Sequence, residues 1–244
     1  MRLSGQVAVI TGGTRGLGRV MAEGFLAEGA SVVCASRNPH DIEELVARSA
    51  GRAAYHRADV TDEASVEALM DRAVREFGGL DVLVCNAGTS ADGKIARLGL
   101  DGWESTLATN LTGTFLCTRA AVAPMEARGG GRIITVSSSL SSRPAIGAAA
   151  YSSSKAAVEM FTRTAAAELA PKNIRVNCLS PGYFDEGMGK RFADTPSIWE
   201  THRLWLSLGR LGRGPELVAA AVFLAGPDSS YVNGHVLEVN GGLQ

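Results

Sequence analysis

The chain has 244 residues, of which 45% are hydrophobic and 20% are charged, and its formal net charge is −1 at pH 7. This length is typical of one α/β domain, and the near-neutral charge with dispersed cations disfavours a nucleic-acid-binding module. The apolar stretches are far shorter than the ~20 residues of a membrane span, and no signal-peptide core precedes the first apolar run, so we expect neither a membrane partner nor export.

Short apolar runs alternate with longer helical stretches along the chain. The expected strands cover residues 7–10, 31–35, 53–57, 81–85, 132–136, 174–179 and 236–239. The expected helices cover residues 16–28, 41–50, 63–77, 103–128 and 151–169, with Thr61 or Asp62 as the N-cap of the helix over 63–77. Strands that alternate with helices form parallel βαβ units. The pattern therefore predicts an α/β fold with a doubly wound parallel sheet of about seven strands, helices on both faces, and a single domain over residues 1–244.

A long segment, residues 183–214, breaks this rhythm because it holds no convincing strand and several bulky side chains. Long irregular stretches in compact domains commonly carry function, so we expect a substrate lid there. Trp199, His202 and Trp205 recur at i, i+3 and i+6 within it. Such residues are either core or subunit contacts, or the lining of a pocket for an apolar or ring-shaped substrate.

A glycine-rich loop, Thr11-Gly-Gly-Thr-Arg-Gly-Leu-Gly18, follows the first expected strand and opens the first expected helix. Glycine lets the backbone turn tightly and approach a pyrophosphate, and the helix N-terminus offers free N–H groups to that anion. A P-loop would need Lys-Ser or Lys-Thr where Arg19-Val20 stands, which disfavours ATP or GTP. The loop predicts a Rossmann-type dinucleotide site. The residues expected to touch the dinucleotide are Gly12, Thr14, Arg15, Gly16, Leu17 and Gly18.

Three further motifs follow in order: Asn86-Ala87-Gly88, Tyr151-Ser-Ser-Ser-Lys155 and Pro181-Gly182. With the glycine loop, they resemble the short-chain dehydrogenase/reductase family over essentially the whole chain. Cys85 stands where that family places the first Asn of Asn-Asn-Ala-Gly, which we expect to cost a strand-bracing hydrogen bond. The resemblance implies cofactor contacts from Asp59, Val60, Asn86, Ala87, Gly88, Tyr151, Lys155, Pro181 and Gly182. Asp59 is equally explained as a structural cap before a helix, and Glu186 replaces a Thr that many relatives use to bind the nicotinamide carboxamide.

The residues after the second expected strand bear on the choice of dinucleotide. An NAD enzyme normally places an Asp or Glu there to bind the ribose 2′-hydroxyl, whereas this chain has Ser36 and Arg37. Arg37 and Arg15 would bind a 2′-phosphate through bidentate hydrogen bonds, unless both are merely surface groups. Both the residues and the resemblance predict NADP(H).

Tyr151 and Lys155 are four residues apart and therefore share one face of the expected helix. Because a fixed cation stabilises a phenolate, we expect Lys155 to lower the pKa of Tyr151. Ser138 ends the fifth expected strand, between Ser137 and Ser139, and the resemblance implies that it binds the substrate oxygen. Asn110 is an unusual residue inside a helix and is either an exposed side chain or, as the resemblance implies, the holder of a proton-relay water. The predicted catalytic residues are Asn110, Ser138, Tyr151 and Lys155.

These observations favour an NADPH-dependent enzyme that reduces a ketone to a secondary alcohol. The alternatives are an NAD(P)-linked polyol or sugar-acid dehydrogenase that works in the oxidative direction, and a non-catalytic dinucleotide-sensing protein. Ser141 and Arg143 are further candidates for substrate contacts. The residues expected to permit close packing in a homo-oligomer, a dimer or tetramer, are Ala156, Ala157, Ala165 and Ala166.

The remaining reactive side chains point to no further chemistry. The four histidines are scattered and no cluster has metal-ligand spacing, so no metal is expected. The four cysteines stand singly in apolar segments, which is typical of buried, reduced thiols and predicts a cytoplasmic protein.

Overall fold

The structure is a computed structural model that describes residues 1–187, 189–190 and 194–244. Within these residues, seven strands form one parallel sheet in the order β3-β2-β1-β4-β5-β6-β7. The strands are β1 (Val7–Thr11), β2 (Ser31–Ser36), β3 (Ala53–Arg57), β4 (Val82–Cys85), β5 (Gly131–Val136), β6 (Ile174–Pro181) and β7 (Val236–Val239). The strand order reverses between β1 and β4, and ligands of such sheets bind at the carboxyl ends of the strands beside this point. The predicted doubly wound sheet is confirmed.

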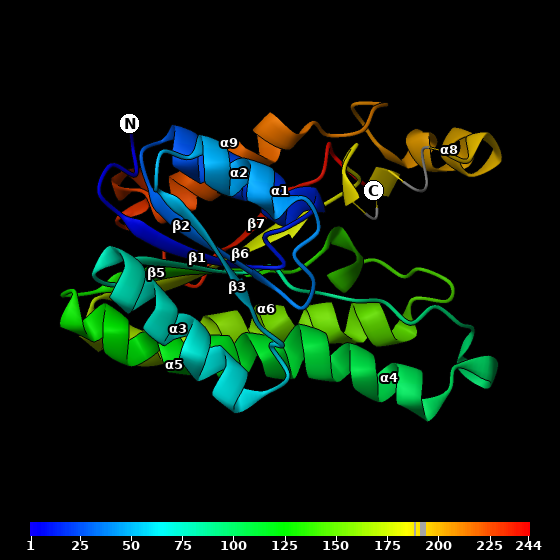
Figure 1. The fold of residues 1–244 in the computed structure, drawn as a ribbon. Helices are drawn as coiled ribbons and strands as arrows, with labels where there is room; N and C mark the ends of the chain where they lie inside the picture. The colour runs from blue at the N-terminus through cyan, green and yellow to red at the C-terminus, as the bar shows by residue number, and fades with distance from the viewer. Residues whose placement is uncertain (188, 191–193) are drawn as a thin grey trace.

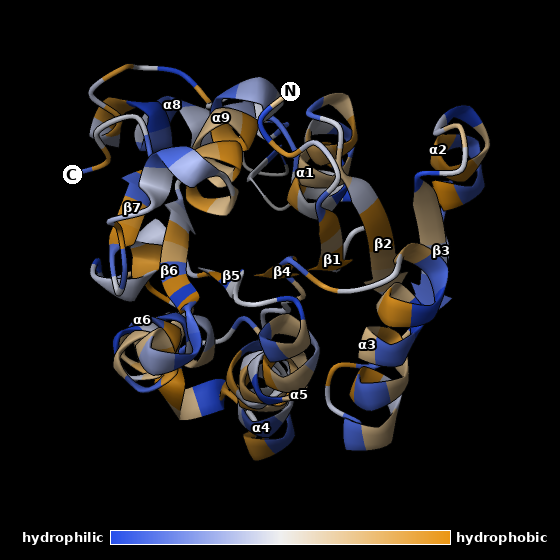
Figure 2. Ribbon diagram, turned by 90° about the vertical axis from the view of Figure 1, so that its left-hand side faces the viewer, coloured by the Kyte–Doolittle hydropathy of each residue, from blue (hydrophilic) through white to orange (hydrophobic). Residues whose placement is uncertain are grey.

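Helices cover both faces of the sheet (Figure 1). One layer holds α1 (Gly16–Ala27), α2 (Ile42–Arg48) and α9 (Gly214–Ala225), and the other holds α3 (Glu63–Phe77), α4 (Leu100–Leu107), α5 (Gly113–Ala127) and α6 (Ala149–Leu169). Figure 2 shows the strands between these two layers. Each layer buries its own apolar cluster against the sheet, one around Phe25 and Leu217 and the other around Leu69 and Met125. Because both faces are covered, a strand such as β1 is buried at every position, which explains its continuous apolar run.

Two helical features differ from the sequence-based expectation. The single helix expected over residues 103–128 is interrupted by a π-helical turn, Ala108–Thr112, between α4 and α5. Helix α9 was not predicted, because its residues are apolar almost all round and show no clear helical period. It packs closely on α1, where a Cβ atom on Gly24 would lie 2.3 Å from Val218 Cγ1.

The expected N-cap of α3 is Asp62, whose carboxylate accepts hydrogen bonds from the backbone N–H groups of Ala64 and Ser65. The described part of residues 183–214 contains α8 (Pro196–His202) and a 3₁₀ turn, Arg203–Trp205, which lie past the carboxyl ends of the strands at the right of Figure 1. Residues 188 and 191–193 of the expected lid lie outside the described residues. In the described part of the chain, no helix is both long and apolar enough to cross a membrane.

Candidate active site

The glycine loop joins the end of β1 to the start of α1. Gly12 and Gly16 have φ angles of +65° and +53°, a region that side chains disfavour. A Cβ atom on Gly18 would lie 2.2 Å from the Gly12 carbonyl oxygen, so only glycine fits there. No side chain caps α1, whose N-cap residue is Arg15. The first amides of α1 therefore keep their capacity to bind an anion such as a pyrophosphate.

The loop after β4 is held against the glycine loop by a small hydrogen-bond network. The Thr11 hydroxyl oxygen accepts hydrogen bonds from the backbone N–H groups of Asn86 and Ala87, both at 3.0 Å. The Asn86 amide in turn donates to the carbonyl oxygens of Thr11 and Gly12, at 2.9 and 3.3 Å. We expected Cys85 to cost this region a hydrogen bond that braces the strand. The Thr11 hydroxyl, which the sequence did not reveal as important, supplies hydrogen bonds that hold the loop after β4.

The carboxyl ends of β2 and β3 carry the groups expected at the adenosine end of a dinucleotide. Ser36 accepts a hydrogen bond from the Thr14 hydroxyl at 3.0 Å and donates to the Asn38 carbonyl oxygen at 2.5 Å. Arg15 and Arg37 are both exposed, and neither forms an ion pair with a described residue. This edge of the sheet therefore offers two exposed guanidinium groups.

Asp59 performs a structural role in the loop after β3. Its carboxylate accepts hydrogen bonds from the backbone N–H and the hydroxyl of Thr61, at 3.0 and 2.8 Å. These bonds, the backbone one foremost, hold the pKa of Asp59 below its ordinary value, and the charge of Arg37 acts in the same direction. Val60 packs its side chain against Gly113, where an added Cβ atom would lie 2.7 Å from Val60 Cγ2. These contacts stabilise the loop before α3, whose N-cap is Asp62, so the cap expected at Asp59 is wrong and its contact with the adenine ring stays a prediction.

The structure brings three of the predicted catalytic side chains together. Ser138 follows β5, while Tyr151 and Lys155 lie in the first turns of α6. The Ser138 side chain is hydrogen-bonded to Tyr151. The Lys155 ammonium lies 5.7 Å from the centroid of the Tyr151 ring and donates to the Val136 carbonyl oxygen at 2.7 Å. A hydroxyl, a phenol and an ammonium thus converge at the carboxyl ends of β5 and β6.

The electrostatics of this group differ from the sequence-based expectation. Burial raises the pKa of Tyr151, while the hydrogen bond with Ser138 opposes this change and the nearby Tyr183 reinforces it. Lys155 is only 4% exposed, and burial lowers its pKa to about 8. The expectation of a lowered Tyr151 pKa is therefore wrong for this structure, because the loss of solvation is the largest influence on that pKa. The Tyr151 phenol holds its proton at neutral pH, which is the state that a proton donor requires.

Asn110 lies in the π-helical turn and is fully buried, which excludes the exposed-residue explanation. Its side-chain oxygen accepts from the Thr89 backbone N–H at 2.8 Å, and its amide nitrogen donates to the Thr89 carbonyl and to the Ser154 hydroxyl, both at 2.9 Å. A Cβ atom on Gly88 would lie 3.4 Å from Asn110 Oδ1 and 3.5 Å from Lys155 Nζ. Gly88 thus keeps a small open space beside both groups. Single π-helical turns within helices frequently mark functional sites.

The segment after β6 forms the upper wall of the site. Pro181 ends β6, and Gly182 follows so close to Asn240 that a Cβ atom would lie 2.7 Å from the Asn240 Cα. Gly187 lies against the glycine loop, since a Cβ atom on Gly16 would be 3.2 Å from its Cα. The chain after β6 therefore crosses above the first amides of α1, and Glu186, half-buried, lies within this crossing.

Aromatic side chains of the expected lid gather on the side of Tyr151. Tyr183 influences the pKa of Tyr151 and packs edge-on against His202, with ring centroids 5.6 Å apart. His202 also contacts the Trp205 ring, at 4.8 Å between centroids. Of the three lid residues singled out in the sequence, His202 and Trp205 thus contact one another, and His202 also contacts Tyr183.

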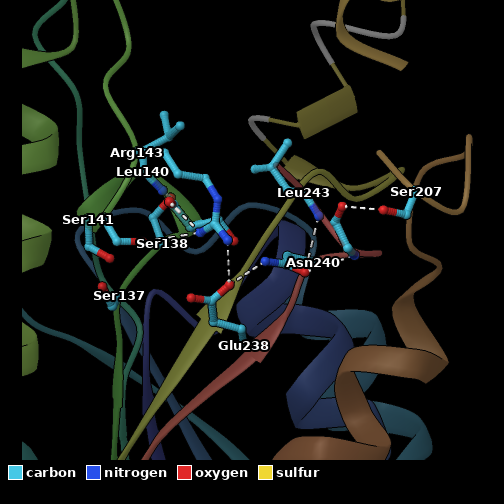
Figure 3. A network of polar contacts seen from close by, with 12 residues as sticks. Ser137, Ser138, Leu140, Ser141, Arg143, Ser207, Glu238, Asn240 and Leu243 are labelled. Atoms are coloured by element: carbon cyan, nitrogen blue, oxygen red, sulfur yellow. Dashed lines mark hydrogen bonds and ion pairs between the residues drawn. The ribbon is translucent and has the colours of Figure 1, made fainter. Parts of the chain in front are cut away.

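Ser141 and Arg143, the other substrate candidates, are engaged within the protein, and Figure 3 shows the contact of Arg143 with Glu238. The Ser141 hydroxyl donates to the Glu159 carboxylate at 2.5 Å, and Arg143 forms a 3.1 Å ion pair with Glu238. Glu159 and Glu238 were not predicted, because single glutamates are common on helices and edge strands and no sequence pattern links them to Ser141 or Arg143. Among the described residues, no group of three or more His, Cys, Asp or Glu side chains could hold a metal ion.

Comparisons with known proteins agree with this geometry. The profile of the family described as enoyl-(acyl carrier protein) reductase matches residues 12–244. The 3-oxoacyl-(acyl-carrier-protein) reductase FabG of Salmonella typhimurium is 32% identical over 100% of this chain and 99% of its own length. A gluconate 5-dehydrogenase from Burkholderia cenocepacia, solved in complex with NADP and tartrate, superposes with a TM-score of 0.93 at 35% identity, over 99% of this chain and 96% of its own.

A short-chain type dehydrogenase/reductase from Mycobacterium marinum superposes with a TM-score of 0.91 at 36% identity, over 98% of this chain and 96% of its own. The similarity extends over nearly the whole chain. The chain therefore belongs to the short-chain dehydrogenase/reductase family, oxidoreductases that act on CH–OH and C=O groups.

Proposed function

We propose that this protein reduces a ketone to a secondary alcohol with NADPH, and that Tyr151 gives the proton to the substrate oxygen. The observation that carries the proposal is the grouping of Tyr151, Ser138 and Lys155, in which the phenol has a raised pKa and is hydrogen-bonded to the Ser138 side chain. A non-catalytic dinucleotide sensor would have no need of this grouping.

The residues around the glycine loop fit NADP(H). The uncapped N-terminus of α1 and the close approach at Gly12 and Gly18 suit a pyrophosphate. Arg15 and Arg37 suit a 2′-phosphate, and no carboxylate stands at the end of β2 to repel it. The relative from Burkholderia cenocepacia was itself solved with NADP. When bound, NADPH supplies the hydride of the reaction.

The chain's own residues then position the ketone and deliver the proton. Ser138 binds the carbonyl oxygen and holds it beside the Tyr151 hydroxyl, which donates its proton as negative charge develops on that oxygen. The buried Lys155 ammonium stabilises the phenolate that remains after the proton leaves. Asn110 is hydrogen-bonded both to Thr89, which follows Gly88, and to Ser154, which precedes Lys155. It therefore keeps Gly88 and Lys155 at a fixed distance from one another.

The alternative is oxidation of a polyol or sugar acid, and the structural similarity to a gluconate 5-dehydrogenase crystallised with tartrate favours it. The raised pKa of Tyr151 suits the proton donor of a reduction, whereas an oxidation needs a base at this position. The two directions are separated by initial rates. NADPH and NADH are tested with a 3-oxoacyl thioester, a cyclic ketone and a 5-keto sugar acid, and NADP⁺ and NAD⁺ with the matching alcohols.

We expect faster turnover at neutral pH with NADPH and a ketone than with any alcohol and NADP⁺. Preferential oxidation of a sugar acid would support the alternative. Failure to bind either dinucleotide, measured by the fluorescence of the reduced cofactor, would refute both.

We further propose that the protein forms a dimer or tetramer through α5 and α6. Phe115 on α5 and Met160 on α6 are 42% and 60% exposed, which is unusual for such large apolar side chains. Ala165 and Ala166, which were expected at this interface, instead lie in the core against the sheet, whereas Ala156 is exposed. Sedimentation equilibrium should give a multiple of the chain mass, and Met160→Asp should weaken the association.

The four cysteines are unpaired and buried, which is consistent with the reducing cytoplasm that we propose as the location of the protein.

A further inference from the structure

The Ser138 hydroxyl is presented by a tight turn that follows β5. Within the turn, the Leu140 backbone N–H donates to Ser138 Oγ at 3.2 Å, and the Ser141 N–H donates to the Ser138 carbonyl oxygen at 2.9 Å. These two bonds fix the shape of the turn. They do not fix where the turn lies relative to α6, which carries Tyr151 and Lys155.

One carboxylate oxygen joins this turn to α6. Glu159 Oε1 accepts a hydrogen bond from the Ser137 hydroxyl at 2.9 Å and another from the Ser141 hydroxyl at 2.5 Å. The two serines bracket Ser138 in the sequence, so Glu159 holds the turn at both of its ends. The Ser137 hydroxyl also lies 3.1 Å from the Lys155 carbonyl oxygen, which brings the same strand end onto the helix backbone.

Glu159 lies on the helix face that matters for the site. It follows Lys155 by four residues and Tyr151 by eight, which places the three side chains along one side of α6. Hydrogen bonds to an ionised carboxylate are about twice as strong as neutral ones, and here they connect two elements that come together only in the folded protein. On its other side the turn is tied to β7 by the Arg143–Glu238 ion pair (Figure 3).

We propose that Glu159 is a positioning residue for the reduction: its carboxylate holds Ser137 and Ser141 so that the Ser138 hydroxyl stays within hydrogen-bonding distance of Tyr151. This inference rests on the proposed function. Glu159 touches neither substrate nor cofactor in this role. Its loss should therefore act on the chemical step and leave dinucleotide binding unchanged, because displacement of a positioned group by about 1 Å can slow a reaction about 100-fold.

The direct test compares Glu159→Ala with Glu159→Gln. We expect Glu159→Ala to lower kcat at least about tenfold while the Kd for NADPH changes less than about twofold. Glu159→Gln should keep most of the activity, because an amide oxygen can accept both serine hydroxyls. Glu168→Ala is the matched control, since Glu168 is an exposed glutamate on the same helix, and it should leave kcat unchanged.

A double-mutant cycle adds a readout that a general loss of stability would not produce. Ser141→Ala alone should lower kcat by a smaller factor, and adding it to Glu159→Ala should lower kcat no further, because the bond is already absent. If Glu159→Ala does not fold, the Ser141→Ala and Glu159→Gln variants still decide the question. Wild-type kcat in Glu159→Ala or in Ser141→Ala, multiplicative losses in the cycle, or a Gln variant as slow as the Ala variant would overturn the inference. A wild-type protein that binds NADPH but reduces no ketone would instead refute the proposed function.

Discussion

Lys155 gives the sharpest quantitative prediction, because burial of its ammonium should destabilise the folded protein at neutral pH. Burial lowers the pKa of Lys155 from 10.5 to about 8. One pKa unit corresponds to about 1.4 kcal/mol, so keeping the ammonium charged costs the folded state about 3 kcal/mol near pH 7. Met at this position fills a similar volume without a charge but leaves the Val136 carbonyl oxygen without its partner at 2.7 Å, a loss of about 1–2 kcal/mol. Lys155→Met should therefore be more stable than the wild type by about 1–2 kcal/mol at pH 7.

The pH dependence tests this reasoning independently of the side-chain packing. Below pH 8 the lysine is protonated in both the folded and the unfolded protein, so the full cost is present. Between pH 8 and 10.5 the unfolded chain binds this proton more than the folded protein does, and the wild type gains stability as the pH rises. The advantage of Lys155→Met should shrink by about 2–3 kcal/mol between pH 7 and 10.

Urea unfolding of both proteins, in reductant and without dinucleotide, measures the difference directly. Lys94→Met, at an exposed lysine, is the control and should differ from the wild type by the same amount at every pH. A difference between Lys155→Met and the wild type that stays constant from pH 7 to 10 would show that the folded protein does not disfavour the charged lysine.

Three other changes probe the cofactor loop, the 2′-phosphate end and the π-helical turn. Replacing both Arg15 and Arg37 by Ala should weaken NADPH binding about 100-fold and NADH binding far less, measured by fluorescence titration, and an equal loss for both would contradict the 2′-phosphate assignment. Gly18→Ala should destabilise the protein by about 1–3 kcal/mol and weaken the binding of both dinucleotides, because the new methyl group would overlap the Gly12 carbonyl oxygen. An unchanged thermal unfolding temperature would contradict this close approach. Asn110→Ala should cost about 2–4 kcal/mol in urea unfolding, because it removes three hydrogen bonds of a buried side chain. A loss below about 0.5 kcal/mol would show that these bonds do not hold the turn.

The sheet and the main motifs could be predicted because their signals are local. Central strands such as β1 and β4 are buried on both faces and read as apolar runs, and the glycine loop needs residues that are adjacent in the chain. The spacing of Tyr151 and Lys155 is likewise set by one helix. These features depend on neighbouring residues alone, so the sequence is sufficient to locate them.

Features that depend on distant parts of the chain could not be predicted in the same way. Glu159 meets the Ser138 turn, and Glu238 meets Arg143, only after the sheet has assembled. The direction of the Tyr151 pKa also depends on burial by surrounding elements, which the spacing to Lys155 does not reveal. The π-helical turn at Asn110 leaves no periodic trace, since the residues on both sides continue as helix.

The central claim is that the Tyr151 hydroxyl delivers the proton in ketone reduction, and Tyr151→Phe tests it most directly because only one oxygen atom is removed. NADPH binding and single-turnover reduction should be measured on the same preparation with a ketone that the wild type reduces. We expect NADPH binding within about twofold of the wild type and a reduction rate lower by about 10²–10⁴, the usual contribution of a positioned acid. A reduction rate equal to that of the wild type would contradict the claim.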